Sequence, residues 1–234
     1  MDWFPPQKPS ELTENRLITA ILDGHFPPGS NLPPERELAA QLGVTRPTLR
    51  EALQRMARDG WLDIRHGVST RVRDYWSEGN LAVLTDIVQR TDHLPSDFVD
   101  NLLAVRLSLA PAYTRLAVEH DSARIERLLT ANVGIDDTPE AFTTADWDLH
   151  HTLTMASGNP IFTLILNGFR DLYQIMGLRY FALPAARDTS RAFYRDLHSC
   201  VSGQDAIAAE DVTRMVMARS LEIWKAALQT TSAD

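Results

Sequence analysis

Residues 33–70 read PPERELAAQLGVTRPTLREALQRMARDGWLDIRHGVST, and this stretch decides the fold of the N-terminal third of the chain. It holds two short helical patterns, Glu35–Leu42 and Arg46–Asp59, which meet at a tight turn at Gly43-Val44. Thr45 can cap the second of these helices, and a glycine follows each helix as a stop signal. Two helices joined in this way predict a helix-turn-helix.

The flanking sequence extends this prediction on both sides. A helix is expected from about Ser10 to Asp23, because apolar residues recur there at helical spacing. Two short strands are expected at Trp61–Arg65 and Thr70–Val72, with a bend at His66-Gly67. Three helices followed by a hairpin predict a winged helix-turn-helix, which is a fold that binds duplex DNA.

The helix expected at Arg46–Asp59 has two functional faces. Its apolar stripe should pack on the other two helices and consists of Leu49, Ala52, Leu53 and Met56. Arg46 and Arg50 lie on a neighbouring face at the N-terminal end, which a recognition helix inserts into the major groove. Their guanidinium groups match guanine or phosphate acceptors. The alternative is that both arginines only form surface ion pairs with Glu35 or Glu51.

Further DNA contacts are predicted around the N-terminal end of this helix. The hydroxyl groups of Thr45 and Thr48 are placed to bind phosphates, and Arg36 is placed to grip the backbone. His66 and Gly67 lie at the tip of the wing, where a donor and a closely approaching main chain suit the minor groove. Over Arg46–Arg73 there are seven basic and three acidic residues, although the whole chain has a net charge of -8. The basic patch is therefore local.

The rest of the chain is expected to be helical. Residues 1–74 form the predicted DNA-binding domain, 75–80 the linker and 81–234 an all-helical effector-binding domain, an antiparallel bundle. A long segment should begin at a Ser96 cap and bend at Pro111. The remaining helices are expected at Ser122–Val133, Pro139–Ala156, Pro160–Leu183, Ala185–Ser202 and Asp205–Thr230. The expected fold class is thus mainly α.

Composition excludes several classes of protein. The chain has one cysteine, so it holds no internal disulfide, and a reducing cytoplasm is the expected location. No apolar run approaches the length of a membrane span, and no membrane partner is expected. There is no glycine-rich phosphate loop, no G-x-S-x-G motif and no complete catalytic set, so neither an enzyme nor a cofactor is predicted.

The N-terminal third closely resembles the GntR family of bacterial repressors. Residues 34–39, PERELA, and 44–53, VTRPTLREAL, match the hallmark of that family. The resemblance supports the assignment of seven residues to DNA contact: Arg36, Thr45, Arg46, Thr48, Arg50, His66 and Gly67. One departure is Val68, because these regulators usually carry Lys after the His-Gly of the wing.

The C-terminal segments 100–106, 156–161 and 222–224 resemble the FadR subfamily. This resemblance implies a seven-helix domain and a homodimer that grips a short palindromic operator. It also implies that a long-chain acyl-CoA releases the DNA, and that the genes repressed or activated serve fatty-acid degradation or biosynthesis. It carries five residues to the acyl-CoA site: Arg106, Tyr173, Tyr180, Ser220 and Trp224. By their spacing alone, the aromatic residues are better explained as core, and only the resemblance assigns them to the ligand.

A competing arrangement points to a different effector. Asp146 and His150 are four residues apart and share a helix face, and His198 lies on a later helix. This resembles a subgroup of the same superfamily that binds a metal and a carboxylate effector and regulates other catabolic pathways. Ser220 stands near the place where that subgroup has a further histidine. The alternative is a hydrogen-bonded Asp146–His150 pair without metal, which our prediction adopts.

Overall fold

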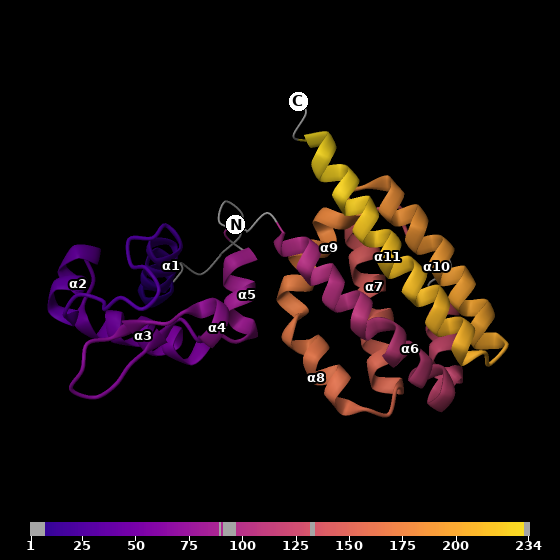
Figure 1. Cartoon of the computed structure of the whole chain (residues 1–234), viewed down its shortest axis with the longest axis horizontal. Helices are drawn as coiled ribbons and strands as arrows, with labels where there is room; N and C mark the ends of the chain where they lie inside the picture. Colours follow the sequence, from indigo (N-terminus) through magenta and orange to yellow (C-terminus); the bar gives the residue numbers. More distant parts are fainter. Residues whose placement is uncertain (1–7, 89, 91–96, 132–133, 232–234) are drawn as a thin grey trace, which may run out of the picture. The chain divides into compact units, whose positions relative to one another are not determined.

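The computed structural model describes residues 8–88, 90, 97–131 and 134–231 and divides the chain into two compact units, Met1–Leu94 and Pro95–Asp234. Both units are mostly helical (Figure 1). Each has its own apolar core. Within the described part of the chain, no helix has the length and apolarity that crossing a bilayer requires.

The N-terminal unit is the predicted winged helix-turn-helix. It contains α1 (Pro9–Leu22), α2 (Glu35–Leu42), α3 (Arg46–Asp59), β1 (Leu62–Asp63), β2 (Arg71–Val72), α4 (Tyr75–Glu78) and α5 (Leu81–Val88). The strands pair antiparallel, with Leu62 opposite Val72. The bounds of α2 and α3 are those predicted, whereas the two strands are shorter than expected.

Local signals explain these helix bounds. The Thr45 side chain accepts a hydrogen bond from the backbone N–H of Thr48 and so caps α3. Gly43 ends α2 with φ +68°, and Gly60 ends α3 with φ +101°, both in the left-handed region that glycine adopts most easily. The predicted apolar stripe of α3 is buried: Leu49, Ala52, Leu53 and Met56.

The structure differs from the expected domain boundary after the wing. The residues expected to be a linker include α4, and α5 packs into the N-terminal core through Val83 and Ile87. Asp86 of α5 also accepts a 2.7 Å hydrogen bond from Trp61 Nε1. The apolar stripe of α5 finds its partners in the N-terminal unit, so this unit extends beyond residue 74.

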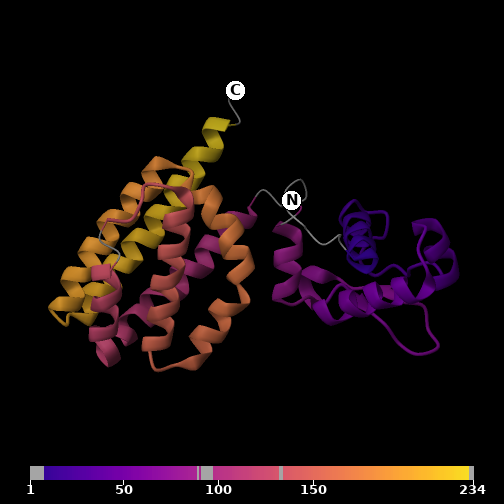
Figure 2. The same cartoon turned by 180° about the vertical axis from the view of Figure 1, so that it is seen from behind.

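The C-terminal unit is the predicted helical bundle. Its elements are α6 (Phe98–Ala131), α7 (Pro139–Ala156), α8 (Pro160–Gly168), α9 (Arg170–Phe181), α10 (Pro184–Ser202) and α11 (Ala206–Thr231). α6 packs against α7, α10 and α11, while α8 lies at the margin of the bundle against α7 and α9 (Figure 2). Over the described residues this gives seven helical segments when α6 is counted as two.

Two breaks refine the predicted helices. α6 runs through Pro111 and leaves helical dihedral angles at Asp121, with φ -151° and ψ 61°, which separates the two helices expected there. The helix expected over Pro160–Leu183 is interrupted at Phe169, where φ is -98° and ψ is 4°. The predicted Ser96 cap and the predicted end at Val133 lie outside the described residues.

Candidate nucleic-acid interface and ligand cavity

The N-terminal end of α3 presents the two predicted arginines on the surface. The side chains of Arg46 and Arg50 are 56% and 57% exposed. Both face Glu35 at the start of α2: Arg50 Nε lies 2.7 Å from Glu35 Oε2, and Arg46 Nη2 lies 3.8 Å from the same atom. Glu51 pairs instead with Arg55, at 3.4 Å.

The ion pair with Glu35 is thus present, but it does not bury the arginines. An exposed ion pair of this kind contributes about 0–1 kcal/mol to the stability of the fold, because water screens the attraction and two long side chains must be ordered. A phosphate or a guanine edge can replace Glu35 at little cost. Glu35 also holds Arg46 and Arg50 side by side, which orients both guanidinium groups before any contact with a partner.

The remaining predicted DNA residues lie in the same unit, at the starts of α2 and α3 and at the wing tip. Arg36 is exposed and has no ion-pair partner within the described residues. Thr45 and Thr48 share a 2.8 Å hydroxyl–hydroxyl hydrogen bond at the start of α3. His66 and Gly67 are exposed at the wing tip, where Gly67 has φ +74°. Val68 is 67% exposed beside them, so the wing ends in an apolar side chain.

A cavity of about 100 Å³ opens in the C-terminal unit among α6, α7, α8, α9 and α11. Its walls are mostly apolar, and they include four of the five residues predicted for acyl-CoA: Arg106, Tyr173, Tyr180 and Trp224. The fifth, Ser220, is buried and donates a 2.9 Å hydrogen bond to the Val216 carbonyl oxygen rather than lining the cavity.

Three residues on this wall carry a polar atom that has no hydrogen-bond partner among the described residues. The atoms are Trp224 Nε1, Tyr180 Oη and His150 Nε2, all shielded from solvent. The Ser220 hydroxyl lies beside Tyr180 and donates its proton to the Val216 carbonyl oxygen. A buried donor without an acceptor costs about 1–3 kcal/mol, which a ligand oxygen inside the cavity would recover.

Arg106 reaches the cavity with its charge already compensated. Its Nη2 lies 2.5 Å from Asp146 Oδ2 of α7, and Tyr173 donates a hydrogen bond to the same oxygen. Tyr194 donates to the other carboxylate oxygen at 3.2 Å. Burial disfavours both charges, but the mutual attraction outweighs it, so the pKa of Arg106 is raised and that of Asp146 is lowered. The charge of Arg106 is therefore held inside the unit.

His150 belongs to the same network. Its Nδ1 is 2.7 Å from the Tyr113 hydroxyl, and its Nε2 is 3.7 Å from Asp146 Oδ1. Burial, reinforced by the nearby Arg106 cation, lowers the pKa of His150 to about 3, so the ring is neutral at physiological pH. Tyr113 and Tyr194 are therefore site residues that the sequence analysis did not assign. Their sequence pattern gave no sign of this role, because aromatic residues at helical spacing are also typical of an ordinary hydrophobic core.

The candidate metal ligands do not come together. Asp146 and His150 are close, but His198 Nε2 lies 3.5 Å from Thr130 Oγ1 on another part of the bundle. Within the part of the chain that the structure describes, no group of three His, Cys, Asp or Glu side chains is arranged to hold a metal ion. The cation beside the Asp146 carboxylate is the guanidinium of Arg106.

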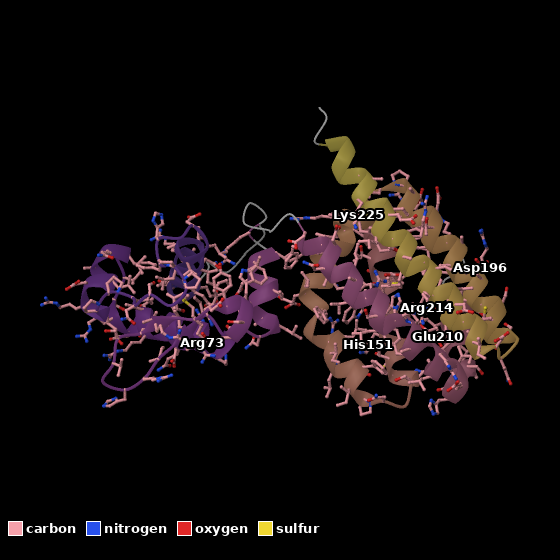
Figure 3. The ribbon with its side chains drawn as sticks, in the orientation of Figure 1. Arg73, His151, Asp196, Glu210, Arg214 and Lys225 are labelled. Atoms are coloured by element: carbon pink, nitrogen blue, oxygen red, sulfur yellow. The ribbon has the colours of Figure 1, made fainter. Side chains whose placement is uncertain are left out.

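The exposed cations of α11 lie outside the cavity. Arg214 pairs with Glu210 at 2.6 Å, and Arg219 pairs with Glu222 at 2.7 Å. Lys225 follows Trp224 near the C-terminal end of α11, well separated from Arg214 along the helix (Figure 3), and its Nζ lies 3.4 Å from Asp100 Oδ2 of α6. Lys225 and Asp100 do not line the cavity, although each directly follows a residue that does, Trp224 and Val99.

Comparisons with known proteins also divide the chain into two parts, although the division falls at residue 72 and not after α5. Residues 9–72 match the family model of bacterial regulatory proteins of the gntR family, and 73–234 match the FadR C-terminal domain. Fatty acid metabolism regulator proteins of Yersinia pestis and Yersinia pseudotuberculosis are 39% identical over 228 residues, covering 97% of this chain and 95% of theirs.

A solved structure supports the fold alone. Lar of Listeria monocytogenes, which controls expression of the agr system, has a TM-score of 0.52 and 14% identity, covering 95% of this chain and 98% of its own. The relatives at 39% identity are named as regulators of fatty acid metabolism. The chain therefore belongs to the GntR family of bacterial regulatory proteins and is a transcription regulator with a FadR-type C-terminal domain, not an enzyme.

Proposed function

We propose that this protein binds a palindromic operator as a homodimer and controls genes of fatty-acid degradation and biosynthesis. We further propose that a long-chain acyl-CoA bound in the helical unit releases the DNA. The observation that carries the proposal is the mostly apolar cavity with unpaired buried polar atoms on its wall, in a chain that also exposes two arginines at the start of α3.

The DNA contact is assigned to α3 and the wing. Arg46 and Arg50 enter the major groove and exchange Glu35 for base edges or phosphates, since the pair they form with Glu35 is exposed. Thr45, Thr48 and Arg36 bind the backbone on either side. His66 and Gly67 approach the minor groove. Two copies related by a twofold axis read the two halves of a palindrome.

The acyl-CoA contact is assigned to the cavity. The hydrocarbon chain occupies its apolar part, Trp224 Nε1 and Tyr180 Oη donate to ligand oxygens, and Tyr173 supports the same wall. Lys225, which follows Trp224 in the sequence, binds the phosphates of CoA. It gives up its ion pair with Asp100 when it does so. Ser220 fixes the backbone of α11 behind Tyr180.

Release of DNA needs an element that moves when the cavity fills. A cavity of about 100 Å³ must widen to hold a long acyl chain. α8 is the wall best able to move, because it lies at the margin of the bundle and none of its residues, all of which the structure describes, is fully buried. Binding would thus favour a bundle conformation that matches DNA poorly, as a population shift.

The test is a titration of oleoyl-CoA into a complex with a duplex selected by the protein from a random-sequence pool. Half-maximal release should occur near the dissociation constant that calorimetry gives for oleoyl-CoA. Trp224→Ala should lose release but keep DNA affinity, while Trp224→Phe, which keeps a smaller aromatic ring and lacks the N–H, should be intermediate. Unchanged DNA affinity at saturating oleoyl-CoA would refute the effector, and sedimentation as a monomer would refute the dimer.

A further inference from the structure

The wing hairpin and the residue directly after it carry three arginines, and two of them are held against the fold. Arg71 of β2 donates to both carboxylate oxygens of Glu78, at 3.2 and 2.9 Å. Arg73, labelled in Figure 3, donates a 3.0 Å hydrogen bond from Nε to the Leu62 carbonyl oxygen at the base of the hairpin. The third, Arg65, has a side chain that is 74% exposed. Its charge stands in solvent, and the DNA contacts proposed above give it no role.

The backbone places Arg65 at the tip of the wing, across the turn from Val68. The Val68 N–H donates a 3.3 Å hydrogen bond to the Arg65 carbonyl oxygen, so the two residues open and close a β-turn with His66 and Gly67 at its centre. Such a turn brings its first and last Cα atoms within about 7 Å of each other. The minor groove is about 6 Å wide and is bordered by two phosphate backbones. Residues that flank a tip inserted there, as Arg65 and Val68 do, are therefore next to phosphates.

The ion pair of Arg65 leaves its guanidinium able to bind a further anion. Its Nη2 lies 2.8 Å from Asp63 Oδ2, on a carboxylate side chain that is largely covered. A guanidinium has five N–H donors, so a contact through Nη2 leaves the donors on the other two nitrogens for a second acceptor. An ion pair with one exposed partner contributes about 0–1 kcal/mol, so a phosphate can also replace Asp63 at little cost. Arg65 can therefore bind a phosphate with or without giving up Asp63.

We propose that Arg65 is the phosphate-binding residue of the wing, so that the cation missing at position 68 stands at the opposite end of the same turn. This inference rests on the proposed entry of the wing into the minor groove. A phosphate contact positions the protein on the duplex and carries no base information. Arg65 thus contributes affinity to operator and random duplex alike, whereas sequence is read by α3.

The test measures the affinity of the full chain for the selected duplex by fluorescence anisotropy over a series of potassium chloride concentrations. Arg65→Gln, which keeps a polar side chain and removes the charge, should lower the slope of log affinity against log salt by about 0.9 per binding site, the effect of one phosphate contact. Binding to operator and to random duplex should weaken by the same factor. Arg65→Lys keeps the cation and should keep the wild-type slope. The double variant Arg65→Gln, Val68→Lys should return the slope to the wild-type value.

A matched control separates the wing contact from a general loss of positive charge. Arg58→Gln removes a cation of similar exposure from the C-terminal end of α3, and it should leave the slope unchanged. Equal slopes for the wild type and Arg65→Gln, with the operator still bound, would overturn this inference alone. A loss of affinity confined to the operator would also overturn it, because Arg65 would then read a base. Failure of the wild type to bind any duplex would overturn the proposed DNA contact with it.

Discussion

Arg106 and Asp146 form a buried ion pair across α6 and α7, with 2.5 Å between Nη2 and Oδ2 and a carboxylate side chain only 4% exposed. The sequence analysis placed these two residues in different candidate sites, one for acyl-CoA and one for a metal. The fold brings them into contact, and two tyrosine hydroxyls donate further hydrogen bonds to the carboxylate. Arg106 lines the cavity and Asp146 does not, so the pair places a compensated charge at the mostly apolar cavity wall.

Breaking this pair from one side should be costly. Arg106→Met leaves the Asp146 carboxylate buried without its cation, and we expect a loss of about 3–5 kcal/mol in the free energy of unfolding. Urea denaturation followed by circular dichroism measures it. The double variant Arg106→Met, Asp146→Leu should recover most of the loss, because no buried charge remains. Equal stability of Arg106→Met and the wild type would show that the pair is not buried.

Acid should destabilise the protein through His150. The pKa of its folded-state ring is lowered from 6.5 to about 3, so between these values the unfolded chain binds a proton that the folded protein does not. Stability from this group is complete above pH 6.5 and falls by about 1.4 kcal/mol per pH unit as the pH drops toward 3. His150→Phe and His150→Gln should both lack this slope. Parallel curves of unfolding free energy against pH for all three proteins would contradict the assignment.

Substitution of Arg46 and Arg50, at the start of α3, should distinguish contacts to bases from contacts to phosphates. Arg46→Ala or Arg50→Ala should cost about 1–3 kcal/mol in binding to the selected operator if the side chain contacts a base, with a smaller loss on random duplex. Arg58→Ala is the matched control, because Arg58 is 71% exposed near the C-terminal end of the same helix. Fluorescence anisotropy gives both affinities. Equal losses on operator and random DNA would assign the residue to phosphate.

The apolar wing tip should lower the salt dependence of DNA binding. Val68 stands 67% exposed next to His66-Gly67, where these regulators usually carry Lys. Val68→Lys should tighten binding and steepen the slope of log affinity against log salt by about 0.9, the effect of one additional phosphate contact. Val68→Ala should leave the slope unchanged. A Val68→Lys slope equal to that of the wild type would show that the tip does not reach a phosphate.

Local signals made part of this structure predictable. The caps and stops around α2 and α3 act within a few residues, so their bounds follow from Thr45, Gly43 and Gly60 directly. The strands ended earlier than predicted because alternation alone does not show how many residues find a partner across a hairpin. The break at Phe169 does have a local signal, since Gly168 directly precedes it, but a single glycine inside a helical pattern does not by itself predict a break.

The sequence by itself determined that the chain has a winged helix-turn-helix, with Arg46 and Arg50 exposed on α3, and a helical second half. Helix propensity, capping and apolar periodicity depend on residues that are close together in the chain, so they can be recognised without the structure. Only the tertiary structure decided that α5 packs with the N-terminal core, that Arg106 pairs with Asp146, and that His198 stands apart from His150. These are contacts between residues distant along the chain. Helical spacing shows which face a side chain occupies, but packing alone selects the residue it meets.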